Sequence, residues 1–278
     1  MRPISDMTTE QAKNLRYVLM DIDDTLTERG KLPAASYEAL WRLKEAGLVV
    51  VPITGRPAGW CDLIAREWPV NGVIGENGAL AFWEADSSDE KLGALPVLMH
   101  AFHPNAVHND HPALLRARDR ALAEVSGCRV SKDQFSRLHD IAIDFAEEDP
   151  VLPLEDARRI KAIFESEGAL AKISSIHVNA WMGVYDKLSM AVRFLADRFG
   201  YDDTRLEDGG DRERVVFAGD SPNDEPMFAH FPLACAVANI HRYSGLIRNE
   251  PAFVTQSECG RGFAELVSII LEKRQPAK

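Results

Sequence analysis

Residues 17–25 read YVLMDIDDT, a short apolar run that ends in a group of acidic residues. A continuous apolar run of this length is typical of a strand buried on both faces of a parallel sheet. In open α/β sheets, ligands bind at the carboxyl ends of the strands. We therefore expect Asp21 and Asp23 to be placed for chemistry, one able to attack a substrate while the other moves protons. Taken alone, the same acids could simply cap a turn at the start of a helix.

Apolar strands and helices alternate on both sides of the inserted middle of the chain. A helix is predicted from about residue 34 to Gly47, followed by a strand at 48–53, a short helix around Leu63 and a strand at 73–74. The end of the chain repeats the pattern, with strands at 215–218, 233–237 and 252–254 and amphipathic helices at 188–199 and 263–270. This order predicts an α/β fold with a Rossmann-like, doubly wound parallel sheet.

Residues 84–182 have a different rhythm. A strand is expected near 97–102, and residues 140–145 alternate between polar and apolar side chains, as in a half-buried strand. Helices are expected around Leu115 and Ile160, and a last strand runs to about Asn179. We interpret this segment as a second α/β domain, an open sheet with helices on one face. It divides the chain into a core at 1–83 and 183–278 and an inserted domain at 84–182.

Three further motifs could carry chemistry, although each has an ordinary structural explanation. Thr54-Gly55-Arg56 follows a predicted strand, where a hydroxyl and a free N–H can hold a phosphoryl oxygen, but Thr-Gly is also common in turns. Lys187 begins a predicted helix, where a cation is unfavourable unless an anion is nearby. Gly219-Asp220-Ser221-Pro222-Asn223-Asp224 follows the strand at 215–218, and helix capping explains only part of it.

Together the four motifs resemble the signature set of the haloacid dehalogenase superfamily of phosphohydrolases. DxDxT at 21–25, Thr-Gly-Arg at 54–56, Lys187 and GDxxND at 219–224 stand in the same order as in that superfamily. The insertion after the second motif, and Glu76-Asn77-Gly78-Ala79 before it, resemble the branch with a large α/β cap. That branch includes the Cof-like and sugar-phosphate phosphatases. Asp24 departs from the pattern, because many relatives have Gly there.

The resemblance implies a role for each motif residue. Asp21 would attack phosphorus and become an aspartyl phosphate, and Asp23 would act as general acid and base. The phosphoryl group would be held by Thr54, Gly55, Lys187 and Asn223. The metal ligands would be Asp21, Asp23 through its backbone carbonyl, and Asp220, supported by Asn223 and Asp224. Independently of the resemblance, carboxylates crowded in one crevice call for a hard cation, and an all-oxygen set suits Mg²⁺.

A sugar-like leaving group would need polar side chains around the catalytic crevice. Alternation along the last strand of the insert places Ser175, His177 and Asn179 on the face opposite the apolar side chains. This polar face either covers the active site or faces solvent. Chain continuity with Lys187 favours substrate binding by His177 and Asn179, together with core residues Arg56, Glu76 and Asn77.

The overall composition limits the partners. Lys and Arg number 32 and Asp and Glu 43, so the formal net charge is −11. An acidic chain without a basic patch argues against nucleic-acid and anionic-membrane partners. No stretch approaches the roughly 20 apolar residues of a transmembrane helix. The four scattered cysteines are expected to be reduced, as in a cytoplasmic protein. The spacing of His100, His103, His108 and His111 allows a zinc site, but spacing alone is weak evidence for one.

The sequence therefore predicts a Mg²⁺-dependent phosphohydrolase acting on a small phosphorylated metabolite, with a sugar phosphate favoured by the resemblance. A phosphomutase would use the same residues while shielding the aspartyl phosphate from water. A catalytically silent protein that binds phosphorylated metabolites is another alternative, against which the intact Asp21, Asp23, Lys187 and Asp220 argue. The leaving group and the oligomeric state are left open.

Overall fold

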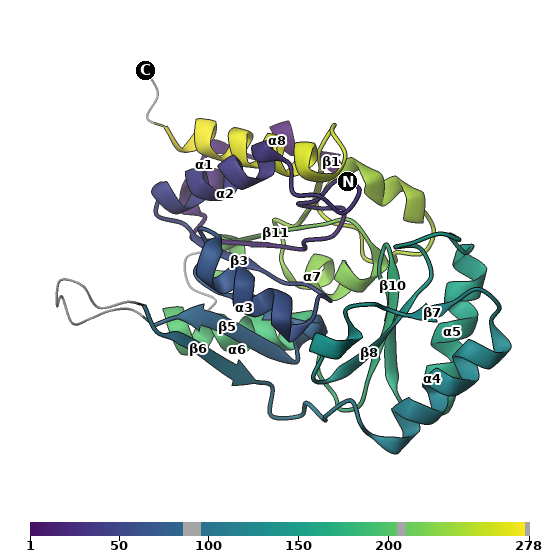
Figure 1. The fold of residues 1–278 in the computed structure, drawn as a ribbon. Helices are drawn as coiled ribbons and strands as arrows, with labels where there is room; N and C mark the ends of the chain where they lie inside the picture. The colour runs from purple at the N-terminus through teal and green to yellow at the C-terminus, as the bar shows by residue number, and fades with distance from the viewer. Residues whose placement is uncertain (86–95, 205–209, 276–278) are drawn as a thin grey trace.

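The computed structural model describes residues 1–85, 96–204 and 210–275 (Figure 1). The core contains a six-stranded sheet in the order β1-β13-β12-β11-β2-β3, and every neighbouring pair is parallel. Its strands are β1 (Arg2–Pro3), β2 (Tyr17–Met20), β3 (Val49–Pro52), β11 (Val215–Gly219), β12 (Cys235–Ala236) and β13 (Phe253–Val254). The predicted parallel sheet is confirmed. Sequence analysis missed β1, whose two residues are too short and too polar to show a strand pattern.

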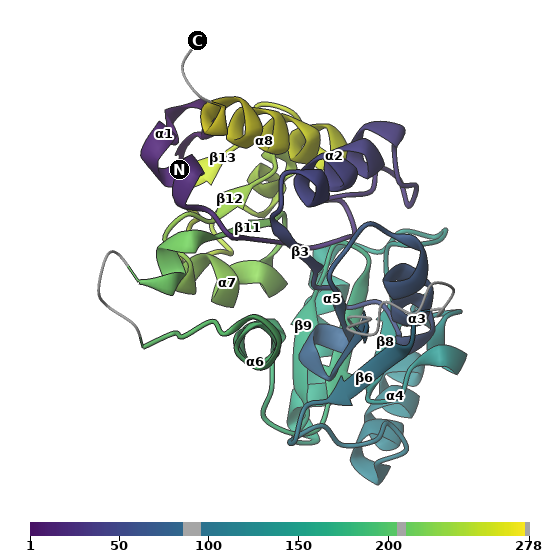
Figure 2. The ribbon, with the colours of Figure 1, turned by 90° about the vertical axis from the view of Figure 1, so that its left-hand side faces the viewer.

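Helices cover both faces of this sheet, as a doubly wound fold requires (Figure 2). One face packs against α1 (Thr9–Asn14), α2 (Ala34–Glu45) and α8 (Cys259–Arg274), and the other against α6 (Lys187–Phe199) and α7 (Glu225–His230). Alternate residues of β2 enter the two apolar cores, with Val18 and Met20 on one side and Tyr17 and Leu19 on the other. Strand β2 is therefore buried on both faces, which explains its continuous apolar sequence.

A three-stranded antiparallel sheet extends the core. It contains β4 (Val73–Gly75), β5 (Leu80–Glu84) and β6 (Leu98–Phe102), and it packs against α3 (Ala58–Glu67). A parallel bridge between Ile53 and Ile74 joins β4 to the chain after β3. The strand expected near 97–102 therefore forms, but it pairs with β5 rather than with the strands of the insert. The sequence of residues 97–102 predicts a strand, but it does not predict the strand with which it pairs.

The insert has its own four-stranded antiparallel sheet in the order β7-β8-β10-β9. The strands are β7 (Arg129–Val130), β8 (Asp140–Asp144), β9 (Leu170–Ile173) and β10 (His177–Trp181). Helices α4 (Pro112–Glu124) and α5 (Leu154–Ser166) pack on one face, against Ile141, Ile143 and Val178. The predicted open sheet with helices on one face is confirmed, and its other face is turned toward the core. We call residues 112–182 the cap.

Short 3₁₀ helices lie in the connections. They are η1 (Ile4–Asp6), η2 (Glu76–Gly78), η3 (Gln134–Ser136), η5 (Asp211–Arg214), η6 (Pro222–Asp224) and η7 (Ala238–Tyr243). Two of them, η2 and η6, contain predicted site residues. None of the helices in the described parts of the chain has the length and apolar character needed to cross a membrane.

Candidate active site

Asp21 and Asp220 are brought together by two neighbouring strands. Strand β2 ends at Met20 and β11 at Gly219, and the two strands pair in parallel, so their carboxyl ends meet at the same edge of the sheet. The Asp21 N–H donates to the Ala218 carbonyl at 2.9 Å. Since the chain goes to β3 on one side of β2 and returns as β11 on the other, this edge is the switch point where open α/β sheets bind ligands.

Lys187 joins this edge from α6 and is buried, with only 2% of its side chain exposed. Its Nζ donates to Asp21 Oδ1 at 2.8 Å and to Asp224 Oδ1 at 2.7 Å. These two carboxylates supply the negative charge that stabilises a lysine at the N-terminus of a helix. Burial lowers the pKa of the ammonium, but the charges of the two carboxylates outweigh burial and raise it. Lys187 therefore remains charged in the interior.

Asp21, Asp220 and Asp224 form a compact oxygen group. All three are buried, and one carboxylate oxygen from each lies within 4.8 Å of the others. The Asp220 carboxylate accepts from Thr25 Oγ1 at 3.2 Å and from Asn239 Nδ2 at 3.0 Å. Asp224 Oδ2 accepts from the N–H groups of Asp220 and Ser221 at 3.0 and 3.3 Å. These contacts fix the orientations of the carboxylates.

The electrostatics of the group call for a cation. Burial, followed by repulsion from Asp224 and Asp23, raises the pKa of Asp21 to about 7 even though Lys187 lowers it. Burial and the charges of Asp224 and Asp21 raise the pKa of Asp220 as well. Three buried carboxylates face one ammonium, and all of the offered donors are hard oxygens. This donor set fits a divalent cation such as Mg²⁺. Within the described residues, no other group of His, Cys, Asp or Glu side chains has this geometry.

The histidines at 100, 103, 108 and 111 therefore do not converge on one point. His103, His108 and His111 each accept a hydrogen bond at Nδ1 from a nearby backbone N–H, and His111 caps α4 in this way. His100 lies between Phe82 and Phe102. Local turns and ring packing explain these residues.

Thr54, Gly55 and Arg56 follow β3 along the same edge. The Thr54 side chain is fully buried, and its Oγ1 accepts from the Arg56 N–H at 3.0 Å. A Cβ on Gly55 would lie 3.1 Å from Asn77 Nδ2 and 3.4 Å from Asn179 Oδ1. A side chain at position 55 would therefore crowd Asn77 of η2 and Asn179 of the cap, which both approach this loop. Asn223, from the fourth motif, is also buried, and its Oδ1 accepts from Ser221 Oγ at 2.7 Å.

The Asp23 side chain is held by Arg56. Arg56 donates to it through Nε at 2.9 and 3.0 Å and through Nη2 at 2.8 Å. Only 4% of the Arg56 side chain is exposed, and its guanidinium also stacks over Trp60. The predicted metal role of Asp23 rests on its backbone carbonyl, so the side chain is left for another task.

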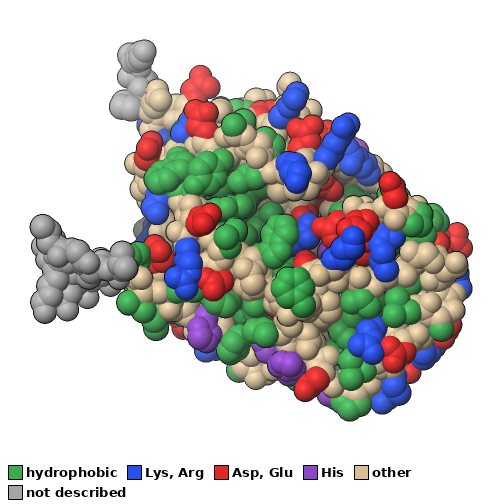
Figure 3. Space-filling model, in the orientation of Figure 1, with side chains coloured by type: hydrophobic (Ala, Val, Ile, Leu, Met, Phe, Trp, Pro, Cys, Tyr) green, Lys and Arg blue, Asp and Glu red, His purple; other side chains and the backbone are tan. Residues whose placement is uncertain are grey.

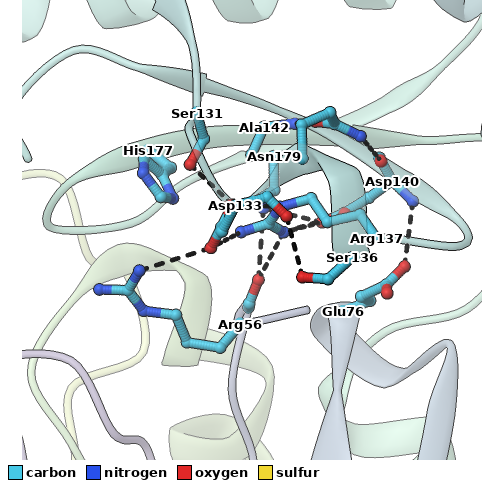
Figure 4. Close-up of polar contacts among 12 residues, drawn as sticks. Arg56, Glu76, Ser131, Asp133, Ser136, Arg137, Asp140, Ala142, His177 and Asn179 are labelled. Atoms are coloured by element: carbon cyan, nitrogen blue, oxygen red, sulfur yellow. Dashed lines mark hydrogen bonds and ion pairs between the residues drawn. The ribbon is translucent and has the colours of Figure 1, made fainter. Parts of the chain in front are cut away.

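Glu76 and Asn77 lie where the core meets the cap. The Glu76 carboxylate accepts from the N–H groups of Ala58, Leu138, His139 and Asp140 at 2.6 to 3.2 Å. Figure 4 shows its contact with Asp140. These bonds tie the cap to the core and occupy the group that was predicted to bind a sugar. The Asn77 side chain lies beside Gly55, and its buried Nδ2 has no hydrogen-bond partner among the described residues. Its predicted contact with a substrate stays a prediction.

His177 and Asn179 reach the core side of the cap sheet, as predicted, but their polar atoms already have partners there. His177 Nε2 lies 2.8 Å from Glu147, and Asn179 Nδ2 donates to Asp140 at 2.7 Å. Next to them, Ser175 lines a cavity of about 310 Å³ with Asp23, Asp24, Arg56 and Glu147. Acidic and basic side chains gather where the core meets the cap (Figure 3). This cavity has room for a small leaving group.

An ionic network that joins the cap to the core has no signature in the sequence. Arg137 is fully buried, and it donates to Asp133, to Asp140 and to the Gly55 carbonyl at 2.8 to 3.0 Å (Figure 4). Asp133 also lies 3.5 Å from Arg56. No motif marks these residues, because their partners are distant in sequence. Thr25 of the first motif, which has no role in the sequence-based prediction, orients Asp220.

Asp24, the departure from the family pattern, adopts a left-handed backbone with φ of 55°. Glycine adopts this conformation without strain, so we expect Asp24→Gly to raise the free energy of unfolding by about 1 kcal/mol. Denaturant unfolding tests this. Arg29→Gly at φ of 52° is a companion variant that relieves the same backbone conformation while removing a charge of the opposite sign, so a gain in both variants points to the backbone. Unchanged or lower stability of Asp24→Gly would contradict the strain argument.

Comparison with known proteins gives a family for part of this chain and a fold for most of it. The family of haloacid dehalogenase-like hydrolases matches residues 18–116. A search of curated proteins finds no match. Among solved structures, a Thermoplasma acidophilum protein is 18% identical, with 92% of this chain and 98% of that chain covered and a TM-score of 0.65. A haloacid dehalogenase-like hydrolase from Bacteroides thetaiotaomicron is 16% identical, with coverages of 92% and 99% and a TM-score of 0.61.

The sucrose-phosphatase from Synechocystis, solved with sucrose and phosphate, is 14% identical. It covers 93% of this chain and 98% of its own, with a TM-score of 0.56. At these identities the structural likeness shows the fold, and the resemblance to haloacid dehalogenase-like hydrolases rests on the matched segment and on the four motifs. Residues 18–116 therefore match the haloacid dehalogenase-like hydrolases, and the chain contains a buried group of three aspartates that could hold a metal ion.

Proposed function

We propose that this protein is a Mg²⁺-dependent phosphatase that hydrolyses a small sugar phosphate through an aspartyl phosphate on Asp21. The observation that carries the proposal is the position of Asp21. Its carboxylate lies at the sheet edge, 2.8 Å from the Lys187 ammonium and within the oxygen group of Asp220 and Asp224. A nucleophile needs its attacking oxygen oriented and the charge of its target neutralised, and this site supplies both.

The residues divide the reaction between them. Asp21 attacks phosphorus while Lys187, Thr54, the Gly55 N–H and Asn223 hold the phosphoryl oxygens. Asp23 gives a proton to the leaving oxygen, and in the second step it takes a proton from the water that attacks the aspartyl phosphate. Asp21, Asp220 and the Asp23 carbonyl would hold the metal ion, with Asp224 and Asn223 orienting the site. When bound, Mg²⁺ would supply positive charge that neutralises the transferring phosphoryl group.

The sugar part of the proposal rests on two supports. The sucrose-phosphatase structure shares this fold and contains a sugar and phosphate. The cavity beside Asp23 combines Glu147, Ser175 and Arg29, which can pair with hydroxyl groups. Of the residues predicted to bind the substrate, Arg56 lines this cavity and His177 contacts its Glu147, while Asn77 and Asn179 lie beside Gly55. Glu76 is better suited to holding the cap in place.

A screen tests the proposed reaction. Purified protein with Mg²⁺ is given a panel of phosphorylated sugars, sugar acids and nucleotides, and release of inorganic phosphate is measured. The expected result is turnover of one or a few sugar phosphates. Isomerisation of a sugar phosphate without phosphate release would instead identify a mutase, and binding without either reaction would identify a silent protein.

Ser175 should contribute to specificity. We expect Ser175→Ala to lower kcat/KM for the preferred sugar phosphate about tenfold or more, because a site built to pair with hydroxyls leaves a polar group unpaired when one partner is lost. For p-nitrophenyl phosphate, which has no such hydroxyl, the change should be small. Parallel assays of both substrates with Ser175→Ala and Asn179→Ala measure the difference. Equal losses on both substrates would show that these residues serve the fold or the chemistry rather than selection.

A further inference from the structure

One guanidinium connects the first catalytic motif to the cap. The Nε and Nη2 atoms of Arg56 hold the Asp23 carboxylate at 2.8 to 3.0 Å. Its remaining nitrogen, Nη1, lies 2.8 Å from Glu147 and 3.5 Å from Asp133, both of which belong to the cap. The side of Arg56 that faces Asp133 is visible in Figure 4. The proton-transfer residue of the core is thus linked through Arg56 to two carboxylates of the cap.

Of these two carboxylates, Glu147 is the stronger partner of Arg56. It follows β8, and its second carboxylate oxygen lies 2.8 Å from His177 Nε2. Burial raises the pKa of Glu147, but the hydrogen bond and charge of His177 and the charge of Arg56 outweigh this and hold the pKa at about 2. Glu147 is therefore ionised at neutral pH and attracts Nη1 at all times. Asp133 is farther away and already binds Arg137 through both oxygens.

The orientation of Asp23 depends on both halves of this link. An arginine side chain has many rotamers, and its planar fork is fixed only when its donors are held on both sides. Asp23 uses one edge of the fork and Glu147 the other, while Trp60 supports the face at 4.4 Å. Without the Glu147 charge, Nη1 loses its short ion pair, and the guanidinium can turn and carry the Asp23 carboxylate with it. Misplacement of a catalytic group by an ångström is costly.

We propose that Glu147 is a positioning residue, which acts through Arg56 to orient Asp23 as the base for hydrolysis of the aspartyl phosphate. This inference rests on the proposed function. In that step a water oxygen bonds to phosphorus, the bond between phosphorus and the Asp21 oxygen breaks, and the water proton passes to Asp23. The contacts of Arg56 with both carboxylate oxygens fix where the Asp23 side chain lies for this proton transfer. Glu147 touches no reacting atom and exchanges no proton.

The inference makes a step-specific prediction for Glu147→Gln, which keeps the shape of the side chain and removes its charge. With p-nitrophenyl phosphate, formation of the aspartyl phosphate needs little help from an acid, because nitrophenolate is a good leaving group. We expect kcat/KM to stay within about threefold of wild type, while kcat falls about tenfold or more. Stopped-flow absorbance should show a burst of nitrophenolate close to one per active site, followed by slow turnover as the phosphoenzyme accumulates.

Glu148→Gln is the matched control. Glu148 is the next residue, and it forms a 2.8 Å ion pair with Lys132 rather than with Arg56. It should behave as wild type. Arg56→Lys provides a second variant, because an ammonium cannot span both carboxylates, and it should show the same burst as Glu147→Gln.

The outcomes distinguish a failure of the proposed function from a failure of the proposed role of Glu147. Wild-type protein that releases no phosphate from any monoester would refute the proposed function. If wild type turns over, then unchanged kcat in Glu147→Gln, or equal losses in kcat and kcat/KM without a burst, would overturn only the role of Glu147. Thermal unfolding of each variant checks that it is folded. A burst in Glu147→Gln that is absent in Glu148→Gln would support the link.

Discussion

Turnover is expected to fall by about four orders of magnitude or more when Asp21 is replaced by Asn, with the fold unchanged. The amide is a far weaker nucleophile than the carboxylate and cannot form the acyl phosphate. The remaining groups of the site could still bind a phosphate, but the aspartyl phosphate on Asp21 would not form. The amide retains an oxygen that can accept from the Lys187 Nζ, which lies 2.8 Å from Asp21 Oδ1. The substitution also removes one of the carboxylates that repel each other in this buried group.

The measurement is phosphate release by purified Asp21→Asn with Mg²⁺ and the best substrate from the screen. Thermal unfolding of the variant shows whether the fold is kept. Wild-type enzyme quenched in acid during turnover should carry a phosphoryl group on the peptide that contains Asp21, and the variant should carry none. Near-normal activity in a pure sample of the variant, or a phosphoryl group on another residue, would refute the covalent mechanism.

The catalytic edge could be predicted because local sequence specifies it. Strands β2, β3 and β11 are apolar runs that end directly before Asp21, Thr54 and Asp220. Parallel pairing then brings the three ends together whatever the details of the loops. Lys187 was identifiable because a cation at a helix start needs a compensating anion. The alternation of residues 140–145 likewise gave the two faces of the cap sheet.

The contacts of the cap with the core could not be predicted in this way. Arg56 reaches Asp23, Asp133 and Glu147, and Arg137 reaches Gly55, across 33 to 91 residues of sequence. Such ion pairs depend on how two separately folded sheets dock, and neither periodicity nor turn chemistry encodes that. The partner of β6 was missed for the same reason. Glu76 was predicted to bind substrate, because three of its four backbone N–H partners, at residues 138–140, belong to the cap and are distant in sequence.

Removal of the metal is expected to abolish activity, and added Mg²⁺ should restore it. The three buried carboxylates and one ammonium leave the site with excess negative charge, which would repel a phosphate dianion. An all-oxygen donor set favours Mg²⁺ over zinc, which prefers nitrogen and sulfur ligands. The assay compares dialysed protein after exhaustive chelation with the same sample after addition of Mg²⁺ or Zn²⁺. Full activity after complete metal removal would refute the metal requirement.

The same site makes the stabilising effect of Mg²⁺ depend on pH. In the metal-free fold the pKa of Asp21 is about 7, raised from 3.8 mainly by burial, and that of Asp220 is raised as well. Between pH 3.8 and about 7, Asp21 binds a proton in the folded chain but not in the unfolded chain. The stability of the metal-free protein therefore falls as the pH rises through this range. Bound Mg²⁺ requires the ionised carboxylates and competes with those protons. The stabilisation of the fold by bound Mg²⁺, about 2.7 kcal/mol at a Mg²⁺ concentration 100 times Kd, should therefore increase as the pH rises.

We expect the increase in Tm on adding Mg²⁺ to be larger near pH 8 than near pH 5.5, and to be largely lost in Asp220→Asn. An equal increase at both pH values, or an undiminished one in Asp220→Asn, would show that Mg²⁺ acts elsewhere on the protein.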